Sequence, residues 1–467
     1  MNRTPAATFR AGVETALAEG WRARSLYAAE GGRVIRLLLT GPDNQTRLES
    51  VVVDGEGSVP SIVDLAPAMG WDEREAHDLH GMLFVGHEPL RPLLDHTAQL
   101  ESWTVPVRGH DPYQVAVGPI HAGVIESGHF RFHVVGDKIL HVDARLFYKH
   151  RGLERAAEGS PAASALAVIS RACAGCMVAN SVAFTTAAEQ TLGLRVTSEL
   201  ARARTFLLEI ERVWNHLNDI AAVCAGVGMA AGNTYFLALT ERARRLNMNV
   251  AGHRLLFGSV AIGRSELVLD DDAVRWCARE LAEINAAAEV GWRELAFNTS
   301  FQDRLDAIGV IDAPTVHRLG TVGPAARAAG VADDIRTTSP YPNYRGFVPV
   351  TSSTAAGDVR ARLEQRVLEL RQSFDLLGAL LDSGPVTPAV AVRDADRQPR
   401  GIGLVESPRG ATSCVIECAG DVVSRVRLRT GSYANWPAVS HAAAGNLLPD
   451  FPLINKSFEL CYACADR

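Results

Sequence analysis

Two Cys-x-x-Cys pairs are the residues whose type and spacing point most directly to chemistry. Cys173 and Cys176 lie in SRACAGCMVANS, and Cys461 and Cys464 lie in SFELCYACADR. A turn or the start of a helix places both sulfurs of such a pair on one side, so that two thiolates converge on one ion. Two pairs together offer four soft ligands, which suit zinc, an iron–sulfur cluster or a thiolate-bound nickel–iron centre.

The separation of the two pairs differs from that of most zinc sites. The pairs of a structural zinc site usually lie about 15–20 residues apart in one small subdomain, whereas these lie in the first half and at the end of the chain. Spacing alone leaves a zinc staple, an iron–sulfur cluster, a catalytic centre and unrelated buried thiols open. The other four cysteines, Cys224, Cys277, Cys414 and Cys418, have no convincing partner pattern. Cys414 and Cys418 lie four residues apart in TSCVIECAG, where a buried apolar strand explains them.

The composition describes a folded protein of more than one domain. The chain has 467 residues, of which 47% are hydrophobic and 21% charged, with a formal net charge of −6. These values exclude a disordered protein and argue against a nucleic-acid binder, which would show a basic face. The beginning of the sequence has no apolar signal segment, and no window approaches the about 18–20 apolar residues of a membrane span. We therefore expect a cytoplasmic chain that can dock on membrane proteins.

Periodicity divides the chain into two domains. Residues 1–98 open with a helical segment, continue with strand segments such as RVIRLLLTG and RLESVVVDG, and predict an α+β domain. Residues 99–117 contain Pro and Gly without clear periodicity, and we expect a linker there. Residues 118–467 predict a mainly α-helical domain with small β regions, which begins with a hairpin around a Gly-Asp turn. Its long helices are expected at 240–257, 270–298 and 359–381.

Six motifs, taken in order, place the cysteine pairs in a wider pattern: GPIHAG, ESGHFRF, HRGLE, SRACAGCMVANS, ESPRG and SFELCYACADR. Together they resemble the motifs of nickel–iron hydrogenase large subunits of the complex-I-related group, of which formate hydrogenlyase large subunits are typical. The segment DEREAHDLHGMLFVGHEPLRPLL resembles the signature of the C-type peripheral-arm subunit of complex I. The resemblance spans nearly the whole chain. It implies a domain like that C-type subunit, fused to a hydrogenase-like domain that also resembles the D-type subunit of complex I.

The resemblance implies a binuclear nickel–iron centre whose iron carries carbonyl and cyanide ligands. Cys173 and Cys461 match terminal nickel ligands, and Cys176 and Cys464 match the cysteines that bridge the two metals. The sequence has no further C-x-x-C motif for an iron–sulfur cluster of its own. An iron–sulfur small subunit similar to the B-type subunit of complex I is therefore implied as the electron carrier. Membrane-arm subunits of a complex-I-like assembly and formate dehydrogenase complete the implied partners.

Two further residues match family positions at the metal. Glu126, in ESGHFRF, matches the glutamate that relays the proton released by heterolytic hydrogen cleavage, and a carboxylate there can pass this proton from a cysteine sulfur toward solvent. Arg409, in ESPRG, matches the arginine above the open metal position, where a fixed guanidinium can polarise bound hydrogen. Without the motifs, an exposed glutamate at a strand end and an arginine in a surface turn are the simpler interpretations.

Glu154, in HRGLE, resembles a family glutamate that is linked to a structural magnesium ion or to the C-terminal segment. Its usual partner there is a C-terminal His, whereas this sequence ends in Arg467. We therefore expect a Glu154–Arg467 ion pair in preference to magnesium. His121 and His150 also lie in matching motifs. The equivalent of His121 in the D-type subunit of complex I faces quinone, and a hydrogen-bonded structural His is the alternative.

Three positions depart from the family pattern. The first pair reads CAGC in place of CGIC, and Asn180 stands where the family has a His after the second cysteine. Glu459 and Leu460 replace an Asp-Pro before Cys461. At the cofactor site Asn180 can donate a hydrogen bond to a thiolate but cannot titrate. None of these changes removes a metal ligand.

Two functions follow. The first is the catalytic large subunit of a hydrogenase, which cleaves hydrogen or reduces protons, passes electrons to its iron–sulfur partner and is held at the inner face of the cell membrane by partner subunits. The alternative is a quinone-reactive or structural subunit of a complex-I-like NADH/quinone oxidoreductase, whose cysteines are empty or hold a structural metal. The start at Met1 and the end at Arg467 resemble a translation product that already has the length of a processed hydrogenase. We therefore expect either metal insertion without a proteolytic checkpoint or no metal.

Overall fold

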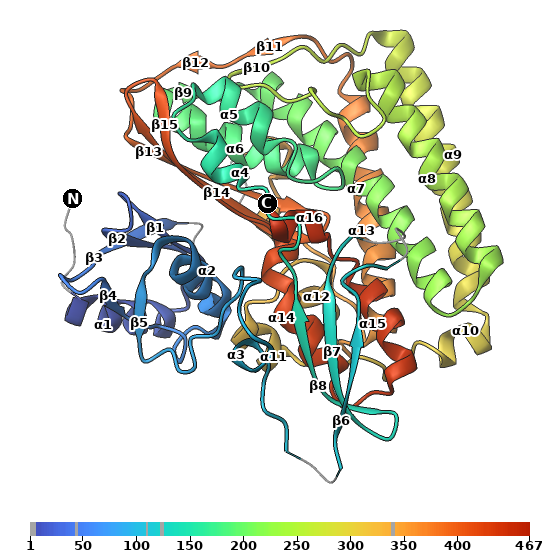
Figure 1. Cartoon of the computed structure of the whole chain (residues 1–467). Helices are drawn as coiled ribbons and strands as arrows, with labels where there is room; N and C mark the ends of the chain where they lie inside the picture. The colour runs from blue at the N-terminus through green and yellow to red at the C-terminus, as the bar shows by residue number, and fades with distance from the viewer. Residues whose placement is uncertain (1–5, 43–44, 109–110, 122–125, 338–340) are drawn as a thin grey trace.

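The computed structural model describes residues 6–42, 45–108, 111–121, 126–337 and 341–467. Helices and strands are mixed along these ranges, with the longest helices in the middle of the sequence (Figure 1). Within them, no helix combines the length and the apolar character that a membrane crossing requires.

The N-terminal region is a helix–sheet unit with a buried central strand. Its antiparallel sheet has the order β1-β2-β3. On β2, Ile35, Leu37 and Leu39 face the core of this unit, whereas Leu38 points to the opposite face and packs against Val415. This alternation follows from the two-residue period of a strand. The elements are α1 (Ala6–Ala18), β1 (Arg22–Ala29), β2 (Val34–Thr40), β3 (Thr46–Val52), α2 (Gly70–His80) and the parallel pair β4 (Ser58–Pro60) and β5 (Leu83–Val85).

The segment 99–117, which we expected to be a linker, contains regular structure. It includes a short helix, α3 (Leu100–Trp103), and a strand, β6 (Tyr113–Val117). β6 pairs antiparallel with β7 (His129–Val135), which forms the predicted hairpin with β8 (Lys138–Arg145). Residues 113–117 are therefore a strand of the following domain's sheet. The sequence contains only a weak signal for this strand, because most of its residues are exposed and it has no clear apolar face.

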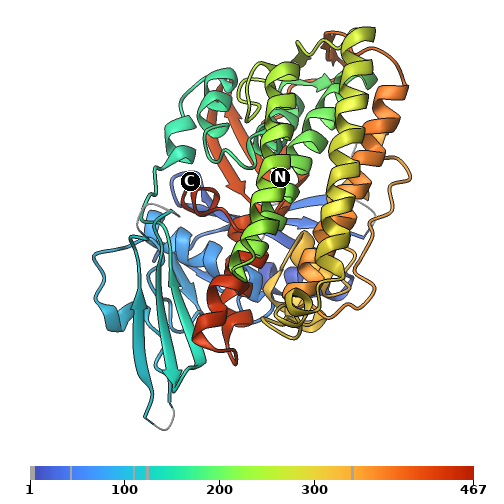
Figure 2. The same cartoon turned by 90° about the vertical axis from the view of Figure 1, so that its right-hand side faces the viewer.

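Four long helices lie side by side (Figure 2). Two of them agree with the helices predicted at 270–298 and 359–381, and a third begins and ends earlier than the predicted 240–257. Three of them begin at a residue whose side chain accepts a backbone N–H, namely Thr197, Asp270 and Asp358, which stabilises the start of each helix. The helices are α7 (Ser198–Gly226), α8 (Ala230–Ala251), α9 (Asp271–Ala296) and α13 (Val359–Asp382).

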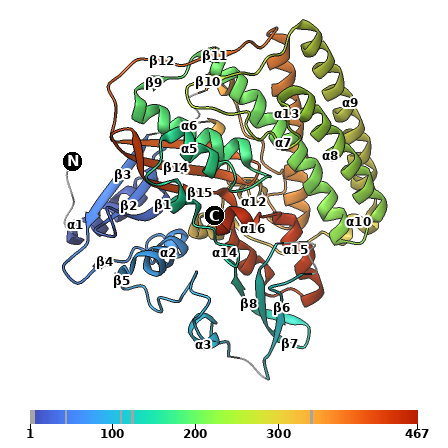
Figure 3. The same ribbon diagram turned by 45° about the horizontal axis from the view of Figure 1, so that its top comes forward.

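A third antiparallel sheet, of order β13-β14-β15, lies between helix α6 (Met177–Leu192) and the N-terminal sheet (Figure 3). One face of this sheet carries α6. An added Cβ at Gly403 would lie 1.8 Å from the carbonyl oxygen of Ala183, so only glycine lets the helix lie directly on the strand. The other face packs on the N-terminal sheet through Val415. The strands are β13 (Arg400–Ser407), β14 (Gly410–Ala419) and β15 (Val422–Arg429).

The C-terminal segment returns to the centre of the molecule, where α16 lies next to the β13–β15 sheet (Figure 1). Its helices are α14 (Gly431–Ala443), α15 (Phe451–Phe458) and α16 (Tyr462–Asp466). The remaining elements are short: α4 (Leu153–Ala157), α5 (Ala162–Ile169), β9 (Leu194–Arg195), β10 (Arg264–Ser265), α10 (Thr299–Asp303), α11 (Ala313–Leu319), α12 (Pro324–Ala328), β11 (Ala389–Val390) and β12 (Val392–Arg393).

Candidate metal centre

The four thiols of the two cysteine pairs meet in one place. Cys173 lies in the loop between α5 and α6, and Cys176 is the residue from which α6 begins. Cys461 stands at the start of α16 and Cys464 lies within it. Cys173 Sγ is 3.0 Å from Cys461 Sγ, and the sulfurs of Cys173, Cys461 and Cys464 all lie within 4.8 Å of one another. Cys176 belongs to the same cluster.

Helix α7 holds the first pair in position. The Glu211 carboxylate accepts the backbone N–H groups of Val178 and Ala179 at 2.6 and 3.0 Å, in the first turn of α6. One turn further along α7, Asn215 Nδ2 donates to the carbonyl oxygen of Gly175 at 2.7 Å. Oxygen acceptors are favourable at a helix N-terminus because its N–H groups lack partners within the helix, and here they act although burial raises the pKa of Glu211 to about 8. The turn that carries Cys173 and Cys176 is thus fixed from one side.

Side chains from other elements hold the second pair. Cys461 N donates to Ser432 Oγ at 3.1 Å, and Ala463 N donates to Glu126 Oε2 at 2.7 Å. Thr430 Oγ1 donates to the carbonyl oxygen of Cys464 at 3.1 Å. Each partner is remote in sequence from the hairpin between α15 and α16, so the second pair takes its position only when the domain is complete.

The pKa values of the thiols differ within the cluster. Hydrogen bonds from Cys173 and Cys464 lower the pKa of Cys176 to about 6, although burial opposes this. The hydrogen bond with Cys173, together with burial, raises the pKa of Cys461 to about 12. A cation would relieve the cost of holding further thiolates in this buried place. Four clustered sulfurs are also the donor set that a soft metal takes.

Asn180 lies directly beside the thiols. Its Nδ2 is 4.0 Å from Cys464 Sγ, as expected for a weak hydrogen-bond donor to sulfur. Its Oδ1 is buried and has no hydrogen-bond partner among the described residues. A buried polar atom without a partner is costly, which is consistent with a group that completes the site when the metal is present.

Glu126 faces the thiol of Cys461. Its Oε2 is 4.0 Å from Cys461 Sγ. Burial, together with the neighbouring Cys461, raises the pKa of Glu126. Glu126 and Cys461 both line a cavity of about 290 Å³, to which His121 and Lys456 also contribute. The alternative of an exposed glutamate at a strand end therefore does not describe this residue.

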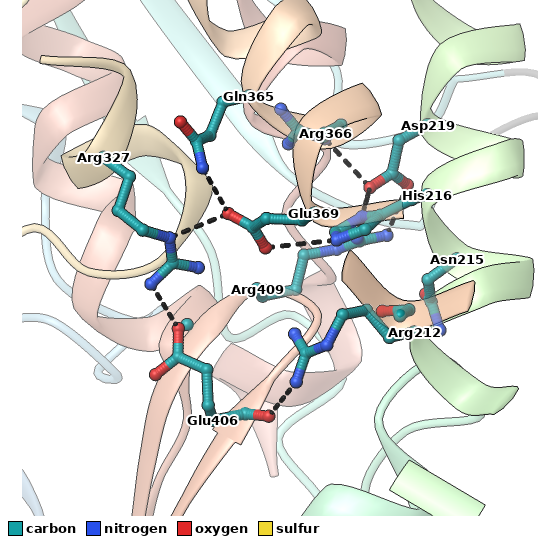
Figure 4. A network of polar contacts seen from close by, with 12 residues as sticks. Arg212, Asn215, His216, Asp219, Arg327, Gln365, Arg366, Glu369, Glu406 and Arg409 are labelled. Carbon is teal, nitrogen blue, oxygen red and sulfur yellow. Dashed lines mark hydrogen bonds and ion pairs between the residues drawn. The ribbon is translucent and has the colours of Figure 1, made fainter. Parts of the chain in front are cut away.

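Arg409 is buried and ion-paired. Its guanidinium is 7% exposed and donates to both carboxylate oxygens of Asp219 on α7 at 2.6 and 2.8 Å (Figure 4). Burial lowers the pKa of Arg409, but the charges of Asp219 and Cys176 raise it above its ordinary value overall. The alternative of an arginine in a surface turn is thus excluded. The positive charge is held near the thiol cluster.

The pair of Arg409 and Asp219 continues into a network of buried charges that sequence analysis missed (Figure 4). His216 Nδ1 lies 3.5 Å from Asp219, and its Nε2 lies 3.2 Å from Glu369. Arg327 donates to Glu369 at 2.8 Å and to Glu406 at 2.9 Å. The sequence did contain one signal of this network, because charged residues recur along the otherwise apolar helix α7. Such residues are usually interpreted as a solvent-exposed helix face.

Glu154 does not lie with the thiols but among arginines. Its carboxylate accepts Leu428 N at 2.9 Å, and guanidinium nitrogens of Arg425, Arg467 and Arg427 lie at 3.1, 3.6 and 3.8 Å. The expected Glu154–Arg467 ion pair is therefore present. Three cations around one carboxylate do not fit a magnesium site, which needs several oxygen ligands.

The two motif histidines make hydrogen bonds to backbone carbonyls. His121 Nε2 lies 2.7 Å from the carbonyl oxygen of Gly128, and His150 Nδ1 lies 2.7 Å from that of Asp466. His150 thus supports the C-terminal segment. His121 supports the loop before β7 and also lines the cavity beside Cys461.

Known proteins resemble this chain over most of its length. The family described as "Respiratory-chain NADH dehydrogenase, 49 Kd subunit" matches residues 226–400 and 390–467, and the corresponding 30 Kd subunit family matches residues 26–114. Formate hydrogenlyase subunit 5 of Escherichia coli (strain K12) is 30% identical over 442 residues, 87% of this chain and 77% of that protein. Hydrogenase-4 component G of the same organism is 30% identical over 466 residues, 92% and 80% of the two chains.

Among solved structures, a chain of the membrane-bound sulfane sulfur reductase, an archaeal respiratory membrane complex, is similar with a TM-score of 0.69 and 26% sequence identity. The match covers 76% of this chain and 99% of that one. The fold and the two matched families define a fused protein that combines complex I 30 kDa-like and 49 kDa-like parts. The chain belongs to the complex-I-related hydrogenase large subunits and is an oxidoreductase of the hydrogenase type.

Proposed function

We propose that the chain is the catalytic large subunit of a nickel–iron hydrogenase and holds the metal centre on Cys173, Cys176, Cys461 and Cys464. The observation that carries this proposal is the convergence of four thiols from remote parts of a hydrogenase-family chain. When bound, a nickel–iron centre supplies the redox-active Lewis acid at which hydrogen is split heterolytically and protons are reduced. All four cysteines would hold the centre through their sulfurs.

Glu126 is the proton carrier in this proposal. Its Oε2, 4.0 Å from Cys461 Sγ, takes the proton from the cysteine sulfur and releases it into the cavity lined by His121 and Lys456. The raised pKa of Glu126 brings its proton affinity closer to neutral pH, where a general acid–base group is most effective. The N–H of Ala463 holds the carboxylate in place during both steps.

Arg409 supplies positive charge at the centre. Asp219 fixes its guanidinium by two parallel hydrogen bonds, so the charge needs no reorganisation when thiolates form beside it. Asn180 donates from Nδ2 toward Cys464 Sγ and tunes that sulfur without exchanging a proton. In this proposal, the change from His to Asn removes a titrating group but keeps the hydrogen bond.

The remaining parts of the proposal concern organisation and partners. Residues 1–98 form the domain like the C-type subunit of complex I, and the hydrogenase-like domain begins with β6 at Tyr113, so the connection between the two is shorter than the expected 99–117. Because the sequence has no further C-x-x-C motif for a cluster of its own, electrons leave through an iron–sulfur small subunit similar to the B-type subunit of complex I. Membrane-arm subunits hold the chain at the inner, cytoplasmic face of the membrane, and formate dehydrogenase is a further partner.

Two observations favour a second function. A quinone-reactive or structural role in a complex-I-like assembly fits the match to the NADH dehydrogenase 49 kDa family. It also fits the cavity beside Cys461, to which His121 contributes an imidazole. In that case the thiols hold a structural metal or none.

Metal analysis separates the two functions. The full chain is produced with its iron–sulfur partner and nickel maturation factors, and nickel, iron and zinc per chain are measured together with hydrogen-dependent dye reduction. We expect stoichiometric nickel and iron, loss of both in Cys464→Ser, and retention in Cys418→Ser, since Cys418 lies outside the cluster and contacts Thr191. Zinc alone, or no metal, together with quinone reduction would instead support the second function.

A further inference from the structure

The side chain of Arg467 is shared between two domains. Its Nη2 lies 2.7 Å from Glu75 Oε1 and also contacts Oε2, whereas Glu154 is 3.6 Å from Nη1. Glu75 lies on α2 of the N-terminal unit, and Glu154 on α4 of the hydrogenase-like domain. The nearer partner of Arg467 is therefore contributed by the N-terminal domain.

The contact is buried and part of a wider junction. Glu75 is 4% exposed and Arg467 2% exposed. Arg427, on β15, also contacts Glu75 and donates to Asp72 of the same helix α2 at 2.8 Å. The Arg467 guanidinium stacks over the ring of Tyr433, 4.6 Å from its centroid. Removal of the Glu75 charge leaves the buried Arg467 guanidinium with only the more distant carboxylate of Glu154, at 3.6 Å, as its counter-charge among the described residues.

Arg467 also ends the segment that carries the second cysteine pair. Its carbonyl oxygen accepts Arg151 N at 2.9 Å and Gly152 N at 3.1 Å, and the Asp466 carboxylate accepts Phe147 N at 2.8 Å. Cys464 lies within the short helix α16, only three residues before Arg467. Arg467 therefore directly follows the helix that carries Cys464 and that begins after Cys461.

We propose that Glu75 is a positioning residue for the metal centre: by holding Arg467, the N-terminal domain keeps the segment with Cys461 and Cys464 closed over the first pair. Glu75 touches none of the thiols and acts only through Arg467. The metal part of this inference rests on the proposed function, whereas the coupling of α2 to the C-terminal segment does not.

Glu73 and Glu75, two residues apart on helix α2, provide a matched comparison. Glu73, also on α2 and fully buried, bonds within the N-terminal unit to Ser61, Ile62 and His87. Glu73→Gln therefore perturbs the same helix without touching the C-terminal segment. Glu75→Gln keeps the shape of the side chain but removes the charge that faces Arg467.

The first measurement is amide hydrogen exchange in the full-length, metal-free chain. We expect Glu75→Gln to accelerate exchange of the amides in 461–467 by at least about tenfold, with near-native exchange in the core of α7, because a local opening exposes only the segment that loses its anchor. Glu73→Gln should leave 461–467 unchanged. Equal protection of 461–467 in Glu75→Gln and wild type, or equal loss in both variants, would overturn the inference.

The second measurement uses the matured complex. We expect Glu75→Gln to lower the nickel content per chain and to broaden the paramagnetic resonance signal of the remaining centre, with partial recovery in Glu75→Asp, which restores the charge. Unchanged nickel content and signal in Glu75→Gln would refute the positioning role. If the wild-type complex contains no nickel, the proposed function fails, but faster exchange of 461–467 in Glu75→Gln still supports the coupling between the domains.

Discussion

Arg409 and Asp219 are joined by two parallel hydrogen bonds of 2.6 and 2.8 Å, although 190 residues separate them in the sequence. The pair ties the turn between β13 and β14 to helix α7, which also holds the first cysteine pair through Glu211. A carboxylate and a guanidinium in this arrangement restrict each other to one orientation. The position of the positive charge beside the thiols is thus set by α7.

Arg409→Lys should lower hydrogen turnover while the metal content stays unchanged. Lysine keeps the charge but cannot make two parallel hydrogen bonds, so the cation is no longer fixed. We expect a loss of about 10²-fold in the rate of hydrogen-dependent dye reduction. Arg397→Lys, in an exposed ion pair with Asp421, is the matched control and should leave the rate unchanged. A wild-type rate in Arg409→Lys would contradict the role of the fixed guanidinium.

Glu126→Gln should slow proton transfer without opening the site. The amide oxygen can still accept the N–H of Ala463, but the side chain can no longer take up and release a proton. We expect the rate to fall about 10²–10⁴-fold, with nickel and iron unchanged. Glu101→Gln, at an exposed position on α3, serves as the control. If Glu126→Gln turned over hydrogen at the wild-type rate, another group would have to carry the proton.

Arg327→Met should destabilise the fold strongly. Arg327 is fully buried and ion-paired with Glu369, Glu406 and Asp334, so its loss removes the positive charge that these three buried acidic groups share. We expect the free energy of unfolding in urea to fall by about 3–5 kcal/mol. Arg371→Met removes an ion pair with Glu289 that is largely solvent-exposed, and should cost less than about 1 kcal/mol. Similar midpoints for the two variants would show that the buried network contributes no more than a surface pair.

Stability should depend on pH through Asp219. Burial raises the pKa of this carboxyl, but Arg409, His216 and Arg366 together lower it to about 2, below its ordinary value of 3.8. Because the folded-state pKa is the lower one, the carboxylate stabilises the fold at pH values above 3.8, and this contribution is lost as the pH falls toward 2. Unfolding measured between these values should show a flatter pH dependence in Asp219→Asn than in wild type. Parallel curves would refute the assignment.

The sequence determined the features that depend on neighbouring residues. Periodicity indicated the long helices α8, α9 and α13, and the Gly-Asp turn indicated the β7–β8 hairpin. The cysteine pairs and the motifs around Glu126 and Arg409 indicated a metal centre. These signals are local, because helix periodicity, turn chemistry and ligand spacing all operate over a few residues.

Only the tertiary structure decided which charged residues pair with each other and which of these pairs support the candidate metal centre. The buried partners Asp219 and Glu75 have the same residue types as ordinary surface carboxylates, so only the fold distinguishes them. Likewise, Arg36 of the N-terminal sheet bonds to Glu417 of β14 across 381 residues. A buried charge is stable only beside its counter-charge. Such pairs form when remote segments pack, within one domain for Asp219 and Arg409 and between the two domains for Glu75 and Arg467, and no sequence window contains both members.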